Sequence, residues 1–351
     1  MPRAQRMNIL YLNHYAGTPA LGMEYRPYYL AREWVRAGHR VQMLAADFSH
    51  VRARQPQAGD ELVDGIAYRW VATPRYAGNG PGRLHNIWTF LRALWRDASR
   101  LAREFRPDAV IASSTYPMDI WVARRIARLA GARLVYEVHD LWPLSPIELS
   151  GMSKWHPFAL LCQAAEDAAY RDADLVVSML PKVQAHMASR GLDLRKLVIV
   201  PNGIAPEEWE AAAPEALRDD VQAAIDAAHA RGALVVGYAG SMGLPNALDW
   251  LLDAAKRVAA EQTALPLAAQ QPKTPLAEQQ SKTPLPEQQS KTPLAFVLVG
   301  DGHERARLAA RLRDEAIAGV QLLPPLPKAQ IPALLRAIDI AYIGWQQVPI
   351  Y

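Results

Sequence analysis

Two apolar segments of this chain run directly into glycine, and a helical pattern follows each of them. The first is 234–241 (LVVGYAGS), and the second is 296–302 (FVLVGDG). A buried strand that ends in glycine at a helix N-terminus suits a bound phosphate, because the ligand can approach the backbone and meet unpaired N–H groups. The pair indicates a nucleotide-type ligand at the carboxyl edge of a parallel sheet, although ordinary α/β turns use the same residues.

Strand and helix patterns alternate along most of the 351 residues. Apolar runs of strand length lie at 7–12, 41–46, 66–71, 109–113, 133–138, 175–178 and 197–200. Helical patterns separate several of them, at 24–37, 87–104 and 118–130. This alternation predicts an α/β fold built on doubly wound parallel sheets, with the strand at 66–71 near an edge.

The alternation pauses once and then resumes, which predicts two domains. The first domain covers 1–205 and ends at Pro201-Asn202-Gly203, and an alanine-rich helical connection covers 206–233. The second domain covers 234–351. Its further strands are expected at 296–299, 320–323 and 338–343, and its helices at 246–260, 303–313 and 329–336.

One segment of the second domain, 265–293, breaks the pattern with a nine-residue repeat whose prolines stand at 266, 275, 284 and 293. Proline blocks a regular helix, and the intervening Gln, Lys and Ser offer nothing to bury. We expect a disordered insertion in a surface loop, where extra length costs little entropy.

Charge and cysteine usage exclude several classes of protein. The formal net charge of +4 is too small to imply nucleic-acid binding. The only cysteine, Cys162, allows no internal disulfide and suits a reducing compartment. A signal peptide, a membrane-spanning run and metal-ligand spacings are all missing from the pattern. We therefore expect a cytoplasmic protein without a bound metal.

Two places in the first domain carry residues suited to chemistry. His139 and Asp140 directly follow the strand at 133–138, where side chains reach a ligand crevice. A histidine there can carry a proton, donate to a sugar or pair with phosphate, and a satisfied polar turn is the alternative. Gly22 stands just before a helix that begins near Glu24, which is another helix N-terminus suited to an anion.

The helix at 87–104 combines an aromatic and aliphatic stripe with several arginines. Trp88, Leu91, Leu94, Trp95 and Leu101 form the stripe. Such a helix could lie on anionic lipid, at the inner face of a plasma membrane. A core-packing helix with a solvated basic face is the alternative.

Several motifs together resemble family 4 glycosyltransferases of the GT-B fold, and in particular the WbuB-like group of bacterial surface-polysaccharide enzymes. They occur in the order of that family and cover nearly all of the chain except the repeat. The matching segments are 8–15 (NILYLNHY), 22–31 (GMEYRPYYLA), 38–41 (GHRV), 136–142 (YEVHDLW), 200–204 (VPNGI), 237–241 (GYAGS) and 299–302 (VGDG).

The resemblance implies two Rossmann-like domains and a retaining transfer that builds O-antigen or capsule polysaccharide, with no cofactor beyond the donor. The donor would be a UDP-sugar held by the second domain, and the acceptor a glycan or polyprenyl-diphosphate-linked glycan on the first. His139 would be catalytic. Donor-binding residues would be Gly22, Gly240, Ser241, Gly300, Asp301 and Gly302, acceptor-side residues Glu24, Arg26 and Asp140, and interdomain-cleft residues Asn202 and Gly203.

The sequence departs from the family pattern in two ways. No basic residue occurs between Gly240 and Lys256, where many relatives place an Arg and a Lys on the diphosphate. The chain also stops at Tyr351, before the expected acidic donor motif and return helix. The resemblance therefore predicts a truncated second domain with weak donor binding. A GT-B-like sugar-nucleotide epimerase and a non-catalytic binding module are the alternative functions.

Overall fold

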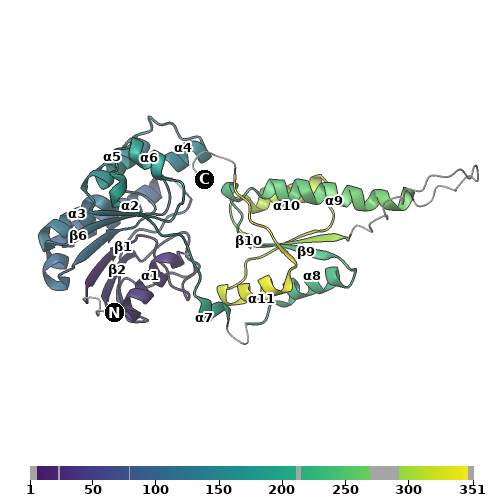
Figure 1. The fold of residues 1–351 in the computed structure, drawn as a ribbon, viewed down its shortest axis with the longest axis horizontal. Coiled ribbons are helices and arrows are strands. Elements are labelled where there is room, and N and C mark those ends of the chain that lie inside the picture. The colour runs from purple at the N-terminus through teal and green to yellow at the C-terminus, as the bar shows by residue number, and fades with distance from the viewer. Residues whose placement is uncertain (1–5, 23, 79, 211–214, 269–291, 347–351) are drawn as a thin grey trace, which may run out of the picture. The chain divides into compact units, whose positions relative to one another are not determined.

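The computed structural model of the chain (Figure 1) describes residues 6–22, 24–78, 80–210, 215–268 and 292–346. They form two compact units, Met1–Ala205 and Pro206–Gln347. Each unit has its own sheet. Most of the predicted repeat insertion, residues 269–291, lies outside the described residues.

The first unit is built on an eight-stranded sheet. Its strands are β1 (Asn8–Leu12), β2 (Arg40–Ala46), β3 (Gly59–Val63), β4 (Ile66–Val71), β5 (Ala109–Ala112), β6 (Arg133–Val138), β7 (Leu175–Ser178) and β8 (Leu197–Ile199). Their order is β3-β4-β2-β1-β5-β6-β7-β8, and only β3 and β4 pair antiparallel. The order reverses between β1 and β5, which is where α/β sheets characteristically bind ligands.

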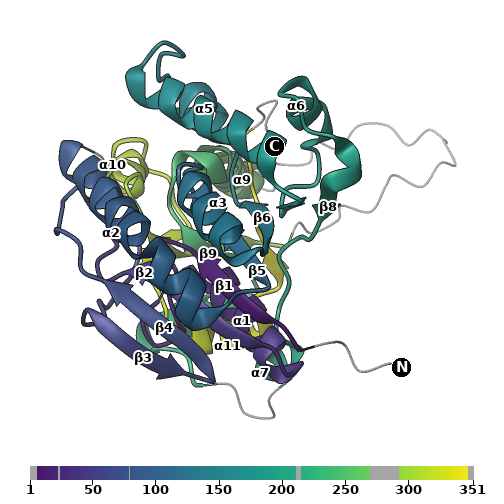
Figure 2. The same ribbon diagram turned by 90° about the vertical axis from the view of Figure 1, so that its left-hand side faces the viewer.

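Helices cover both faces of this sheet (Figure 2). They are α1 (Tyr25–Arg36), α2 (Pro81–Phe105), α3 (Asp119–Ala130), α4 (Leu144–Ser150), α5 (Pro157–Asp172) and α6 (Gln184–Ser189). Because side chains alternate along a strand, Tyr11 of β1 packs on the α1 side, whereas Leu10 and Leu12 pack with α2, α3 and α5. The prediction of a doubly wound α/β unit is thereby confirmed.

The strand β3 lies at one edge of the sheet, where the apolar pattern predicts none. Its Asp60 and Glu61 are exposed, so it lacks the alternation that reveals a strand. Asp64 and Gly65 connect it to β4 with φ values of 49° and 81°, the geometry of a two-residue hairpin turn. The strand expected near the edge, β4, is therefore second from it.

The long helix α2 divides its predicted stripe between core and surface. Leu91, Leu94 and Leu101 are buried, whereas Trp88 and Trp95 are 61% and 44% exposed. The helix therefore packs against the core, which is one of the two alternatives for this segment, and it leaves two tryptophan side chains exposed to solvent. Among the described helices, none is both long and apolar enough to cross a bilayer.

The second unit has a four-stranded parallel sheet in the order β11-β10-β9-β12. The strands are β9 (Leu234–Ser241), β10 (Leu294–Asp301), β11 (Val320–Leu323) and β12 (Ile340–Ala341). The helices are α7 (Pro206–Trp209), α8 (Asp219–His229), α9 (Leu248–Ala268), α10 (Arg305–Asp314) and α11 (Ile331–Ala337). Residues of α9 and α10 cover one face and those of α8 and α11 the other, so this smaller sheet is also doubly wound.

Three elements of the second unit differ from the sequence pattern. The segment predicted as a connection folds as α7 and α8, and α8 buries Val221 and Ile225 against the sheet. The helix α9 continues to Ala268, beyond the expected end at 260 and past the first proline of the repeat. The last strand has two residues rather than six, because only Ile340 and Ala341 pair with β9.

Candidate functional site

Four polar side chains meet at the carboxyl edge of the first sheet, and with Arg26 we call them the strand-end cluster. They are Tyr11, Ser113, Glu137 and His139. His139 Nε2 lies 2.8 Å from Ser113 Oγ, and Ser113 Oγ donates to Glu137 Oε2 at 2.7 Å. Tyr11 OH donates to the same carboxylate oxygen. Glu137 is thus the centre of a buried hydrogen-bond network.

The strand geometry explains why these side chains meet. Glu137 and His139 are two residues apart, so both point to the face that α1 covers. Tyr11 of β1 occupies the same face. Ser113 follows β5, and its backbone N–H donates to Asp119 Oδ2 at 3.1 Å, which fixes the turn into α3. The cluster therefore spans the point where the strand order reverses.

Arg26, near the start of α1, joins this cluster to the chain that follows β8. Its Nε donates to Glu137 Oε1 at 3.0 Å. Its Nη2 donates to the carbonyl of Val200 at 2.8 Å, and its Nη1 donates to Pro201 O and Asn202 Oδ1, each at 3.1 Å. One guanidinium therefore holds three distant segments together, and its bond to the carboxylate is the strong, charge-assisted kind.

The charges of the cluster stabilise one another. Burial by itself raises the pKa of Glu137, but His139 and Arg26 outweigh burial and hold that pKa well below its usual range. Burial likewise lowers the pKa of His139, but Glu137 and then Glu24 outweigh it and raise the pKa. The imidazole is 10% exposed, so a ligand can reach it at the sheet edge, and its raised pKa favours the protonated ring.

Asp140 is directed into its own turn rather than toward His139. Its carboxylate accepts from the backbone N–H of Leu141 at 2.9 Å and from Trp142 Nε1 at 3.3 Å, and also from the hydroxyl of Ser145. Burial raises its pKa. This is the satisfied polar turn that the sequence leaves open as an alternative, and it describes Asp140, whereas the catalytic role of His139 stays a prediction.

The loop between β1 and α1 brings Glu24 toward the cluster. Gly22 and Glu24 both have positive φ, at 84° and 60°. A Cβ on Gly22 would lie 3.2 Å from the Cβ of Ala53, so glycine meets both the backbone and the packing requirement there. Burial raises the pKa of Glu24, and the nearby charges of His139 and Arg52 oppose that rise.

The glycines of the second unit bring two backbones together. Gly240 of β9 pairs with Gly300 of β10, and a Cβ on Gly300 would lie 1.9 Å from the carbonyl oxygen of Gly240. A Cβ on Gly302 would lie 2.4 Å from the carbonyl oxygen of Met242. The tight packing of the strand ends therefore requires these glycines, whether or not a phosphate binds.

Polar groups at this second edge bond mainly within the turns. Asp301 Oδ1 accepts from the N–H of Gly302 at 2.8 Å, and the carbonyl of Ser241 accepts from Asn246 Nδ2 at 2.7 Å. The side chains of Ser241 and Asp301 belong to exposed residues. The five predicted donor-side residues of this unit thus lie at the ends of two paired strands.

Asn202 and Gly203 follow β8 in exposed chain. Asn202 is held by Arg26, and the assignment of both residues to an interdomain cleft stays a prediction. The residues that the pattern did not reveal are Tyr11, Ser113 and Glu137. A carboxylate in an apolar strand, two residues before His139, was the available signal for Glu137, because alternate residues share a face.

Acidic, histidine and cysteine side chains do not gather into a metal-binding group anywhere in the described ranges. A second histidine near the cluster, His14, is fully buried between Tyr116 and Asn86, with ring-nitrogen distances of 2.5 Å and 2.7 Å. Burial lowers its pKa to about 3, so it stays neutral. His14 is therefore a polar member of the core.

The glycosyl transferase 4-like domain family has a model that matches residues 22–203, just over half of the chain. Arg26, Ser113, Glu137 and His139 all lie within the matched span. No curated protein sequence matches the chain.

Several solved structures share the fold. HepE from Anabaena with bound UDP-glucose is 17% identical with a TM-score of 0.57, covering 97% of this chain and 74% of its own. Sucrose-phosphate synthase from Thermosynechococcus elongatus is 14% identical with a TM-score of 0.63, covering 97% and 77%. WaaG, a glycosyltransferase involved in lipopolysaccharide biosynthesis, is 12% identical with a TM-score of 0.55, covering 97% and 75%. These likenesses show the GT-B fold.

Proposed function

This chain belongs to the glycosyl transferase 4-like family, and from this membership we propose that it is a retaining glycosyltransferase with a UDP-sugar donor. HepE, a fold neighbour, is described in complex with UDP-glucose. We further propose a glycan or polyprenyl-diphosphate-linked acceptor in the synthesis of a bacterial surface polysaccharide, at the inner face of the plasma membrane. WaaG, which acts in lipopolysaccharide biosynthesis, supports that role.

The observation that carries the proposal is the position of His139 at the strand-order reversal, beside the buried carboxylate of Glu137. Its Nε2 is occupied by Ser113 Oγ at 2.8 Å, and Glu137 favours the protonated ring. Nδ1 would then donate to the acceptor or to the sugar in transfer. A positioned cation in a largely dry site stabilises the negative charge that develops as the diphosphate leaves.

The second unit would hold the donor through backbone groups. Gly240, Ser241, Gly300, Asp301 and Gly302 end two adjacent strands, and Gly302 stands shortly before α10. A helix N-terminus offers unpaired N–H groups and a partial positive charge to a diphosphate. Gly22, in the loop before α1, stays a predicted donor-binding residue of the first unit. Glu24 and Arg26 would line the acceptor side.

The test is an assay of UDP release from UDP-glucose and UDP-GlcNAc, with a polyprenyl-diphosphate-linked sugar as acceptor. We expect His139→Ala to slow transfer at least about tenfold, about 1.4 kcal/mol of transition-state stabilisation. His186→Ala is the matched control. His186 Nε2 also lies near a glutamate, 3.1 Å from Glu166 Oε1, but this histidine belongs to α6 and not to the strand-end cluster. Unchanged turnover in His139→Ala would remove this residue from the site.

The same assay separates the alternatives. Conversion of UDP-GlcNAc to another sugar nucleotide without acceptor would identify an epimerase. Neither transfer nor conversion with any donor, from a folded protein, would favour a binding module.

A further inference from the structure

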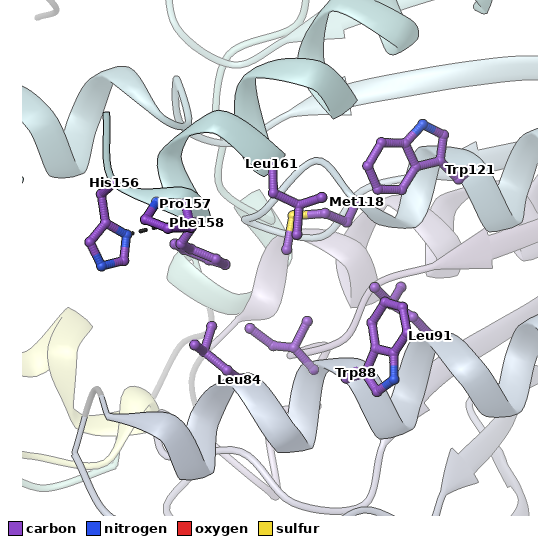
Figure 3. A pocket seen from close by; sticks show the side chains of 10 residues that line it. Leu84, Trp88, Leu91, Met118, Trp121, His156, Pro157, Phe158 and Leu161 are labelled. Carbon is purple, nitrogen blue, oxygen red and sulfur yellow. Dashed lines mark hydrogen bonds between the residues drawn. The ribbon is translucent and has the colours of Figure 1, made fainter. Parts of the chain in front are cut away.

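An apolar groove of about 340 Å³ opens on the helical layer of the first unit (Figure 3). It lies among the first turns of three helices, α2, α3 and α5. The residues used in the argument are Leu84, Trp88, Met118, Trp121, Phe158 and Leu161. Because these helices begin at the carboxyl edge of the sheet, the groove lies at the same end of the unit as the strand-end cluster.

Large apolar side chains at the rim of this groove are exposed to solvent. Trp88 is 61% exposed, and Leu84 and Leu161 are 43% and 41% exposed. Trp155 and Leu160, which are sequence neighbours of the groove residues His156 and Leu161, are 72% and 48% exposed. Isolated exposed apolar residues are ordinary, but a contiguous group that surrounds a hollow indicates an interaction surface.

Basic residues accompany the exposed aromatic rings. Arg125 lies 4.8 Å from the ring centre of Trp95, and Lys154 lies 5.4 Å from that of Trp155. Arg92 and Arg96 of α2 are exposed as well. The acid that follows them, Asp97, pairs with Arg100. Tryptophan beside Lys and Arg is the composition of surfaces that enter the headgroup layer of anionic bilayers.

We propose that this groove and its rim dock the first unit on an anionic lipid bilayer, with lipid acyl chains entering the groove. The inference rests on the proposed function, because it supplies the surface on which a lipid-linked acceptor would be presented. The groove connects to the site through side chains. Phe158 lies 5.8 Å from Trp142, ring centre to ring centre, and Trp142 Nε1 donates to Asp140, the neighbour of His139.

The test is flotation of the full chain with vesicles of phosphatidylcholine, alone or mixed with phosphatidylglycerol. We expect binding to the mixed vesicles, and at least about a tenfold lower partition for Trp88→Asp/Leu161→Asp. Trp250→Asp is the matched control, since Trp250 of α9 is 52% exposed but lies on the second unit. Equal flotation of the double variant and the wild-type chain would overturn the proposal, as would no flotation of either.

Two further readouts identify the occupant. Bromine-labelled acyl chains should quench the tryptophan fluorescence of the wild-type chain more strongly than that of Trp88→Phe, and equal quenching would contradict entry into the groove. If sedimentation showed a dimer that the double variant dissociates, the surface would belong to a second copy instead, and the proposal would fail.

Flotation uses no sugar nucleotide, so its result is independent of the transfer reaction. Vesicle binding without any transferase activity would leave the docking surface intact and contradict the proposed function. Transfer to a water-soluble acceptor should be unchanged in Trp88→Asp/Leu161→Asp. Loss of that transfer would show that the two substitutions disturb the fold. Flotation would then be repeated with Trp88→Gln alone, and we expect this variant to partition measurably less onto the mixed vesicles. Wild-type partition of Trp88→Gln would overturn the proposal.

Discussion

The carboxyl edges of the two sheets consist of different kinds of residue. The first edge gathers ionisable side chains, with Arg26 and His139 both bonded or paired to Glu137. The second edge is built from glycine, so that the carbonyl of Gly240 can occupy space that a side chain on Gly300 would need. Side-chain chemistry is therefore concentrated at the first edge, whereas the second offers backbone groups.

This difference determines how each edge should respond to substitution. Altering one charge in a buried network leaves its partners without their hydrogen bonds and shifts their pKa values. Two backbones in contact leave no room for adjustment. We expect changes at the second edge to reduce stability through steric overlap, and changes at the first edge to act through charge that is left unpaired.

The largest effect is expected for Gly300→Ala. The new methyl group would lie 1.9 Å from the carbonyl oxygen of Gly240, so β9 and β10 would have to separate. We expect a loss of about 3 kcal/mol or more in the free energy of unfolding, measured by urea denaturation. Gly80→Ala is the control, because a Cβ there meets nothing within 4 Å. Similar losses in both variants would refute the close-contact explanation.

A smaller but still large effect is expected for Arg26→Met. The substitution removes the guanidinium that lies 3.0 Å from the buried carboxylate of Glu137. Because that charge is then partly unpaired, we expect the free energy of unfolding to fall by up to about 3 kcal/mol. Arg69→Met is the comparison, since its partner Asp60 is 66% exposed and the pair should contribute under about 1 kcal/mol. If the two variants lost the same amount of stability, the Arg26–Glu137 pair would contribute no more than an exposed surface ion pair.

Glu137→Gln should act mainly on the proton affinity of His139. Glu137 is what overcomes burial, so its neutralisation should move the pKa of His139 from above the ordinary value to below it. The measurement is an NMR titration of the imidazole, with His14 as the internal reference. We also expect transfer to slow about tenfold near neutral pH. An unmoved pKa would mean that Glu137 does not set the charge of His139.

The smallest effect is the pH dependence of stability from this pair. The raised pKa of His139 contributes stability that is complete below about pH 6.5, the unfolded value, and is lost as pH rises through the folded pKa. The lowered pKa of Glu137 contributes stability present above about pH 4.3 and lost as pH falls through its folded pKa. The stability difference between the wild-type chain and Glu137→Gln should be largest between these values. A difference that does not shrink when the pH rises through the folded pKa of His139, or falls through that of Glu137, would contradict the pairing.

Much of the fold follows from local pattern. Apolar runs followed by glycine or a helical period correctly place most strands and helices, because burial on both sides of a parallel sheet demands such runs. The edge strand β3 was not predictable in this way, since its exposed Asp60 and Glu61 bury nothing. The helix α8 also carries no signal of its role, because an alanine-rich helix reads alike whether it links domains or covers a sheet.

The candidate site was predictable in part. His139 stands out because it follows a strand, and the match to family motifs marks Arg26 and Gly22. Glu137 escapes notice because it lies inside an apolar run, where a carboxylate gives no sign of the partners that make its burial tolerable. Asp140 looks equivalent to His139 in sequence, and only the hydrogen bonds to Leu141 and Trp142 separate their roles.

The sequence by itself determined the alternation of strands and helices, the glycines that end them and the membership in a family. Only the tertiary structure decided which strands are neighbours. Tyr11 and Glu137 are 126 residues apart along the chain, and Arg26 and Asn202 are 176 apart. The first contact exists because the strand order places β1, β5 and β6 side by side, and the second because Arg26 reaches the chain that follows β8. Local periodicity fixes the face on which a side chain lies, but the identity of its neighbours depends on long-range pairing that no short segment encodes.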